Sequence, residues 1–235
     1  MRAVILAGGK GVRLKPYTVS LPKPLVPVGE EPILKILLQN LRRQGVREAT
    51  ICVNHMADLI EAYFGDGSKF GISVQYTHEQ QPLGTAAPIK LIKSLPDDFL
   101  VMNGDLLTDI SFKQLYWQHK NSDAIMTIAT HNQKIKVDYG VIQTGPDHTA
   151  ESFVEKPTYE LDVCMGIYAL NKRALEYIPD GTRFGFDDLV NALLAKGEAV
   201  TTFPHTGYWL DIGRPEEYEQ ANNDCRQLLN DNQAN

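Results

Sequence analysis

The chain begins with a short apolar segment that leads directly into a cluster of glycines. Residues 3–7 (Ala-Val-Ile-Leu-Ala) include two β-branched residues, and this composition predicts a buried strand. Three glycines and two cations follow it, at Gly8, Gly9, Gly11, Lys10 and Arg13. Backbone without a Cβ bends tightly, and its free N–H groups form an anion-binding concavity. The segment therefore predicts a polyphosphate site at the end of a strand, with a plain strand-to-loop turn as the alternative.

Length, charge and cysteine content limit the classes of protein to consider. The chain has 235 residues, 43% of them hydrophobic, which suffices for a sizeable core. Its net charge of −6 argues against bulk attraction to nucleic acid or an anionic membrane, so any anion site has to be local. Three cysteines without CxxC spacing indicate neither a disulfide framework nor a zinc site. With no signal peptide or membrane span in the pattern, we expect a cytoplasmic protein.

Strand-like and helix-like segments alternate through the first half of the chain. Strands are predicted over residues 49–53, 73–76 and 99–103, and helices over 33–44, 57–64 and 86–95, the last with Thr85 as its N-cap. This βαβ alternation predicts an α/β fold with a mainly parallel sheet and right-handed crossovers.

The second half is richer in strands. We expect strands over 124–129, 140–143, 150–155 and 165–170, forming a mixed sheet or a smaller β extension, and helices over 172–177, 186–195 and 215–230. One shared core predicts a single domain over 1–235. A nucleotide half (about 1–120) and a second-substrate half (about 121–220) would both face the carboxyl ends of the strands.

Candidate functional residues follow the predicted strands. The loop after the glycines holds four prolines in residues 16–27, and this stiff segment presents Lys23 between two of them. Asp105 follows one strand and Asp211 ends another apolar run. Two such carboxylates are able to hold Mg²⁺, which takes oxygen ligands and substrate phosphates. The plainer interpretations are a solvated lysine and two turn-forming acids.

A later strand ends in a second charged motif. At Glu155-Lys156-Pro157, the acid is able to accept hydrogen bonds from sugar hydroxyls and the lysine to bind a phosphate. Gly140 offers a place where a ligand approaches the backbone. Taken alone, these residues fit a surface ion pair and a hairpin glycine better.

Together, the motifs resemble the sugar-1-phosphate nucleotidylyltransferase family over residues 1–220, and guanylyl members in particular (mannose, heptose or hexosamine 1-phosphate). The matching segments are Leu6-Ala-Gly-Gly-Lys-Gly-Val-Arg-Leu14, Pro22-Lys-Pro-Leu-Val-Pro-Val28, Pro82-Leu-Gly-Thr-Ala86, Asn103-Gly-Asp105, Tyr139-Gly-Val141, Val154-Glu-Lys-Pro157, Gly166-Ile-Tyr168 and Trp209-Leu-Asp-Ile-Gly213. Two positions depart from the family pattern. Val12 replaces a threonine near the phosphates, and Cys164 replaces an asparagine that touches the sugar.

The resemblance implies a Rossmann-like nucleotidyltransferase fold, Mg²⁺ dependence and the reaction NTP + sugar 1-phosphate → NDP-sugar + pyrophosphate. It implies catalytic roles for Arg13, Lys23, Asp105 and Asp211, the two acids binding the metal. The implied nucleotide contacts are Leu6, Ala7, Gly8, Gly9, Gly11, Arg13, Lys23, Glu79, Gly84 and Asn103. The implied sugar-phosphate contacts are Gly140, Glu155 and Lys156. No nucleic-acid or membrane partner is implied, and the oligomeric state is left open.

The expected nucleotide is GTP, because the run Pro82-Leu-Gly-Thr-Ala86 and the pair Lys23-Pro24 resemble guanylyl members. Glu79 also lies five residues before Gly84, which the resemblance implies to contact the base. Guanine presents N1–H and N2–H₂ as adjacent donors that one carboxylate accepts together, whereas uracil and thymine place carbonyls beside their single N–H. If Glu79 is instead an exposed loop acid, UTP or dTTP becomes the alternative.

Three other functions compete with this one. A catalytically silent regulator that binds a nucleotide sugar would not need Arg13, Lys23 and both acids together. A GT-A glycosyltransferase lacks the Gly-Gly-x-Gly-x-Arg loop. In a dinucleotide-binding dehydrogenase the glycines would be spaced G-x-G-x-x-G, unlike those found here.

Overall fold

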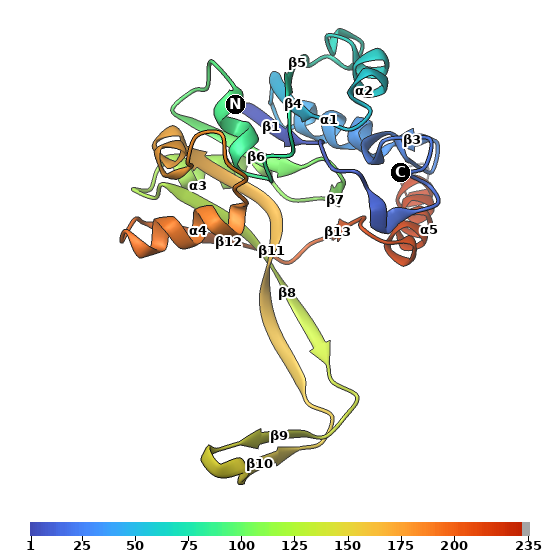
Figure 1. Ribbon diagram of the computed structural model, residues 1–235. Coiled ribbons are helices and arrows are strands. Elements are labelled where there is room, and N and C mark those ends of the chain that lie inside the picture. Colours follow the sequence, from blue (N-terminus) through green and yellow to red (C-terminus); the bar gives the residue numbers. More distant parts are fainter. Residues whose placement is uncertain (232–235) are drawn as a thin grey trace.

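A seven-stranded mixed sheet forms the centre of the molecule, in a computed structural model that describes residues 1–231 (Figure 1). Its strands, in spatial order, are β12 (Val200–His205), β8 (Met126–Lys136), β11 (Thr158–Asn171), β6 (Asp98–Asn103), β1 (Arg2–Leu6), β4 (Glu48–Val53) and β5 (Ser73–His78). Only β11 runs antiparallel to its neighbours. The predicted α/β fold with a mainly parallel mixed sheet is confirmed.

Alternating side chains of β1 enter two hydrophobic layers, one on each face of the sheet. Ala3 and Ile5 pack beneath α1 (Ile33–Arg43), α2 (Ala57–Phe64) and α3 (Phe112–Lys120). Val4 packs on the other face with α4 (Phe186–Ala195) and with the 3₁₀ segments η4 (Ala87–Leu91) and η6 (Lys172–Tyr177). A third, smaller cluster joins α5 (Pro215–Asp231) to the loop after β1.

Short elements connect these layers. They are the 3₁₀ turns η1 (Val12–Leu14), η2 (Lys23–Leu25), η3 (Ser68–Phe70) and η5 (Pro146–His148), and the strands β2 (Pro27–Val28), β3 (Glu31–Pro32), β7 (Leu106–Thr108), β9 (Val141–Thr144), β10 (Ala150–Val154) and β13 (Trp209–Asp211).

The helix predicted over 86–95 is wrong. Only residues Ala87–Leu91 turn, as a 3₁₀ helix, because the N–H groups of Ala86 and Ala87 both donate to the carbonyl of Phe184. Thr85 does not cap this turn either. Its Oγ1 accepts from the N–H of Phe186, 3.0 Å away, and so ties the segment to the start of α4.

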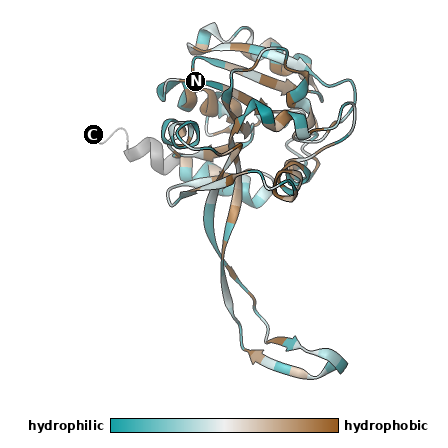
Figure 2. Ribbon diagram, turned by 90° about the vertical axis from the view of Figure 1, so that its left-hand side faces the viewer, coloured by the Kyte–Doolittle hydropathy of each residue, from teal (hydrophilic) through white to brown (hydrophobic). Residues whose placement is uncertain are grey.

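A long two-stranded arm leaves the body of the molecule (Figure 1). Strands β8 and β11 stay paired beyond the sheet, from Cys164 opposite Thr130 out to Thr158 opposite Lys136. The antiparallel hairpin β9–β10 forms the tip. Figure 2 shows the same arm outside the body after a quarter turn. The predicted mixed sheet and the predicted β extension therefore both occur.

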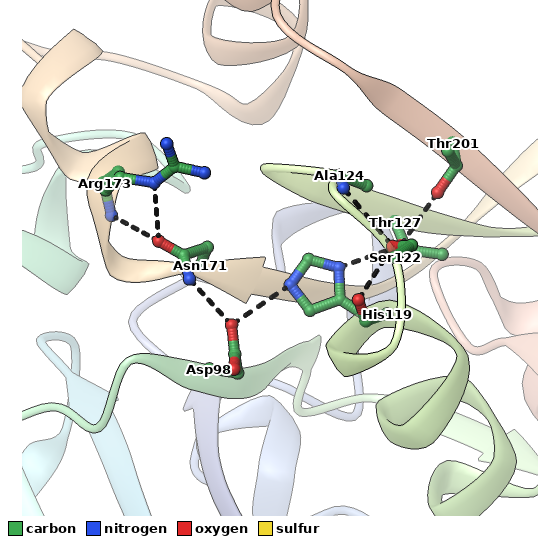
Figure 3. A network of polar contacts seen from close by, with 8 residues as sticks. All are labelled: Asp98, His119, Ser122, Ala124, Thr127, Asn171, Arg173 and Thr201. Atoms are coloured by element: carbon green, nitrogen blue, oxygen red, sulfur yellow. Dashed lines mark hydrogen bonds and ion pairs between the residues drawn. The ribbon is translucent and has the colours of Figure 1, made fainter.

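A buried histidine of α3 belongs to a polar network with residues from four strands of the sheet (Figure 3). His119 Nδ1 lies 2.9 Å from Thr127 Oγ1, which in turn lies 2.9 Å from Thr201 Oγ1. His119 Nε2 lies 3.7 Å from Asp98 Oδ1, an oxygen that also accepts from Asn171 Nδ2 at 2.8 Å. Burial lowers the pKa of His119, and the network anchors α3 to β6, β8, β11 and β12.

Among the helices of the described residues, none combines the length and apolar character that crossing a membrane requires.

Candidate functional site

A cavity of about 550 Å³ opens at the carboxyl ends of β1, β4 and β6. Each of these strands ends in a loop that contributes to its wall. Eleven residues singled out from the sequence line it together: Leu6, Ala7, Gly8, Gly9, Gly11, Arg13, Lys23, Glu79, Gly84, Asn103 and Asp105. They come from four separate stretches of the chain, and parallel strand order brings those stretches to one edge.

The glycine loop is shaped by two different constraints. Gly11 has a φ of +60°, and a Cβ there would stand 2.8 Å from Thr18 Cγ2, while Thr18 Oγ1 donates to the Gly11 carbonyl at 2.7 Å. At Gly8, a Cβ would stand 2.8 Å from Glu79 Oε1. At Gly9 a Cβ would meet no atom within 4 Å, so open space faces the backbone there. This gap fits the close approach of a ligand.

Lys23 joins the stiff loop to the acidic part of the cavity. It starts the turn η2 directly after Pro22, and its Nζ forms an ion pair with Asp105 Oδ2. Both side chains are largely buried, at 12% and 21% exposure. The pair fixes Lys23 between the glycine loop and the carboxylates.

Two short strands bring the carboxylates together. Asp105 precedes β7, and β13 pairs antiparallel with β7 so that Asp211 lies opposite Leu106. The N–H of Ile212 also donates to the carbonyl of Asp105, 3.1 Å away. Burial first, and then the negative charge of Asp105, raise the pKa of Asp211 to about 6.

The same carboxylates fit a hard divalent cation. Asp105 Oδ1 is buried and has no hydrogen-bond partner among the described side chains. Within residues 1–231, no group of three or more His, Cys, Asp or Glu side chains gathers as a metal cluster. A site with two carboxylates suits Mg²⁺, which keeps waters and binds substrate phosphates in its remaining positions.

Three cations line the cavity besides Lys23. They are Lys10, Arg13 and Arg183, and none of them has an ion-pair partner among the side chains that the structure describes. Arg183 was not expected from the sequence, since it stands in a loop before α4 with no motif around it. The contacts between the Phe184 backbone and the segment at Ala86 bring that loop to the cavity.

Glu79 is half buried in the cavity wall, which contradicts its interpretation as an exposed loop acid. Its Oε2 accepts from the N–H of Leu83 at 2.9 Å, the Asn54 side chain also hydrogen-bonds to it, and burial raises its pKa. Gly84 has a φ of +89°, and a Cβ there would stand 2.7 Å from the Phe184 carbonyl. Backbone packing alone therefore requires that glycine.

The structure does not bring Gly140, Glu155 and Lys156 to the cavity. All three lie near the tip of the arm (Figure 1). The missing Cβ of Gly140 makes room for the ring of Phe153, 2.6 Å from where that atom would stand. Lys156 has a φ of +46°, a left-handed conformation that is costly for a side chain before a proline.

The arm begins at Cys164, the position that departs from the family pattern. The Cys164 Sγ donates to Tyr168 Oη at 3.2 Å and accepts from the N–H of Gly166 at 3.4 Å. Gly166 itself has a φ of +70°, and a Cβ there would stand 2.5 Å from Asn103 Nδ2. The root of the arm is thus packed against the end of β6, beside the cavity.

Comparison with known proteins places this geometry in a family. A family model described as "Nucleotidyl transferase" matches residues 2–227. A mannose-1-phosphate guanylyltransferase catalytic subunit beta from Drosophila pseudoobscura pseudoobscura is 35% identical over 92% of the chain and 60% of the relative. A UTP–glucose-1-phosphate uridylyltransferase from Synechocystis is 33% identical over 94% and 62%. The chain thus spans about six tenths of the length of these two relatives.

A solved structure agrees over nearly its whole length. HddC from Yersinia pseudotuberculosis superposes with a TM-score of 0.73 and 30% identity, covering 95% of this chain and 98% of HddC. The complex of HddC with GMP-PN superposes with a TM-score of 0.72 and 29% identity over the same shares.

Proposed function

The chain belongs to the nucleotidyl transferase family, and on that premise we propose that it transfers a nucleotidyl group from an NTP to a sugar 1-phosphate, releasing pyrophosphate. One observation carries the proposal. A single cavity joins a glycine loop and cations that have no ion-pair partner among the described side chains to Asp105, and the pairing of β7 with β13 holds Asp211 beside that carboxylate. Such a site suits two phosphate substrates that have to meet despite their charge.

The reaction needs positioning more than covalent help from the protein. A phosphate oxygen of the sugar 1-phosphate attacks the α-phosphorus of the NTP, and the bond from that phosphorus to the β-phosphate oxygen breaks in line. The backbone N–H groups of the loop at Gly8, Gly9 and Gly11 hold the triphosphate. Arg13 and Lys23 stabilise the charge that develops on pyrophosphate.

Asp105 and Asp211 would hold Mg²⁺, which when bound supplies neutralisation of the phosphate charges. Before substrate binds, Lys23 occupies one oxygen of Asp105 and leaves the other free. The lysine is therefore already held at the position where triphosphate and carboxylates meet.

The preferred nucleotide is GTP. The carboxylate of Glu79 stands in the cavity wall, where its remaining lone pairs are able to accept from the two adjacent donors of guanine. A named guanylyltransferase among the relatives and the GMP-PN complex of HddC support the same choice. The uridylyltransferase of similar identity keeps UTP as the alternative.

For the second substrate, we assign Gly140, Glu155 and Lys156 to the sugar phosphate. The chain then acts as one domain over 1–235, in which residues from about 1 to 120 serve mainly the nucleotide and residues from about 121 to 220 mainly the sugar phosphate.

The test is a matrix of NTPs against hexose, heptose and hexosamine 1-phosphates, read as pyrophosphate release. We expect turnover with GTP and one class of sugar phosphate, and its loss in Asp105→Asn. Binding of nucleotide sugars without any pyrophosphate release would instead favour a catalytically silent regulator.

A second measurement tests the base. The kcat/KM ratio of GTP to UTP should fall by about tenfold or more in Glu79→Gln, because guanine loses the carboxylate that accepts its paired donors. Wild-type preference for UTP or dTTP would refute the GTP assignment. An unchanged ratio in the variant would show that Glu79 does not select the base.

A further inference from the structure

The arm extends into solvent and does not pack into the core of its own chain. Not one side chain between Asn132 and Cys164 is buried. Its tip exposes Tyr139 at 79%, Phe153 at 63% and Ile142 at 57%. A two-stranded ribbon is only marginally stable in water, and a gathered apolar surface of this kind marks a contact site. In Figure 2, hydrophobic segments alternate with hydrophilic ones on the hairpin, away from the body.

The arm also keeps its charged motif from reaching its own cavity. The ladder between β8 and β11 is unbroken from Thr130 opposite Cys164 to Lys136 opposite Thr158. Bending the tip back onto the body would break this pairing and leave its N–H and C=O groups without partners. With the arm extended in this way, Glu155 and Lys156 lie outside the cavity of their own chain.

The arm leaves the sheet at the edge where the parallel strands end. Strand β8 runs parallel to β6 and β1, and its carboxyl-terminal part continues into the arm. The cavity opens at the carboxyl ends of β1 and β6. Arm and cavity therefore share one edge, so a twofold axis across that edge would lead each arm past the other copy's cavity.

The rim of the cavity offers a matching apolar surface. Val12, which lines the cavity, is 60% exposed, and Val19 and Leu21 in the following loop are exposed as well. On the arm, Lys134 and Lys136 are neutralised by Glu160 and Asp138. Among the described side chains, Lys156 has no such partner, and its backbone is held in the left-handed region.

We propose that a second copy of this chain covers the arm, and that each arm carries Glu155 and Lys156 into the sugar-phosphate side of the partner copy's cavity. The apolar tip packs on the rim loop of the other copy, and each active site takes its nucleotide half from one chain and Lys156 from the other. This assignment rests on the proposed function for the role of Lys156, but the contact between copies does not.

The contact is tested by the mass in solution, measured by size-exclusion chromatography with light scattering. We expect twice the chain mass of 26.3 kDa for the wild type. A variant in which residues 138–157 are replaced by Asn-Gly should be monomeric and folded by circular dichroism, since it loses no buried side chain. A monomeric wild type, or a dimer that survives removal of the tip, overturns the proposal.

The shared site is tested by complementation. Asp105→Asn and Lys156→Ala are each expected to lose most turnover alone. Co-expressed with different tags and purified as mixed dimers, they should regain about half of wild-type turnover, because one of the two sites combines an intact body with an intact arm. Lys134→Ala, on the shaft of the same arm, is the matched control and should stay active alone.

The outcomes separate the two proposals. If the wild type is active and dimeric but the mixed dimers stay inactive, the arm serves its own chain. If Lys156→Ala is fully active, Lys156 does not take part in the site. A wild type that releases no pyrophosphate with any substrate pair overturns the proposed function, while the mass measurements still decide the contact.

Discussion

Asp105 and Asp211 are chemically alike, but their surroundings differ. Asp105 is paired with Lys23, so its charge is compensated within the protein. Asp211 has no cation in direct contact among the described side chains, and its pKa is raised to about 6 by burial and by Asp105. At neutral pH the fold therefore holds Asp211 ionised at a cost in free energy, as is common where function requires a strained charge.

The two Asn variants should accordingly differ in stability. Asp211→Asn removes the unfavourable charge and should raise the free energy of unfolding at pH 7.5 by about 1 kcal/mol. Asp105→Asn leaves Lys23 buried without its partner and should lower it by about 1–3 kcal/mol. Both should lose most turnover. Urea unfolding measures the difference, and equal destabilisation by both substitutions would contradict it.

Metal affinity should depend on pH through the same residue. Because the pKa of Asp211 is about 6 in the metal-free protein, the carboxyl gains a proton as the pH falls through that value and ceases to be a ligand. Calorimetric titration should show weaker Mg²⁺ binding at pH 5.5 than at pH 7.5, with proton release on binding near pH 6. In Asp211→Asn both effects should vanish, and an unaltered pH dependence there would point to another group.

Arg183 should act on the nucleotide although no motif surrounds it. It lines the cavity and, among the described side chains, has no carboxylate partner. Loss of a charge-assisted contact to phosphate in Arg183→Ala should raise the KM for NTP by about tenfold. The exposed Arg43→Ala on α1 is the matched control for loss of one surface charge. Steady-state kinetics decide between them, and equal KM values would exclude the contact.

At the scale of elements, one buried residue of α3 takes part in a polar network with the sheet. His119 reaches β8 through Thr127 and approaches Asp98 at the start of β6 (Figure 3). Its Nε2 has no hydrogen-bond partner among the described residues. Burial is the main cause of its lowered pKa and outweighs the opposing charge of Asp98.

Acid should therefore loosen α3 in a specific pH window. Because burial lowers the pKa of the folded imidazole, the unfolded chain takes up this proton at a higher pH, and stability is lost as the pH falls below the ordinary value of about 6.5. Between pH 8 and 5.5 the wild type should lose more free energy of unfolding than His119→Gln. His148→Gln, exposed on the arm, should keep the wild-type slope, and identical slopes in all three proteins would refute the link.

At the scale of the whole molecule, the body and the arm differ in kind. The body has a core on each face of its sheet, whereas no side chain between Asn132 and Cys164 is buried. If two copies cover each other's arms, the thermal midpoint should rise with protein concentration, because association stabilises only the folded chain. Midpoints measured over a hundredfold range of concentration should shift in the wild type and stay constant without the tip. A constant wild-type midpoint would contradict the paired arrangement.

Local patterns predicted the elements that depend on local contacts. Helices α2 and α4 were predicted at their observed bounds, since their apolar residues repeat at helical spacing. The failure at 86–95 came from the Phe184 carbonyl, almost a hundred residues away, which claims the donors of that segment. Helix α3 was missed although Ser111 caps it by accepting from the N–H of Gln114.

The sequence alone determined which motifs line the glycine-loop side of the cavity, because their residues stand in short segments, most of them directly after a strand, and parallel strands end at one edge of the sheet. Tertiary structure decided what no local pattern encodes. The pairing of β7 with β13 brings Asp105 and Asp211 together. Backbone hydrogen bonds from Ala86 and Ala87 to the Phe184 carbonyl hold the neighbouring Arg183 at the cavity. The ladder between β8 and β11 carries Lys156 away from the body, since its direction depends on how strands some thirty residues apart align.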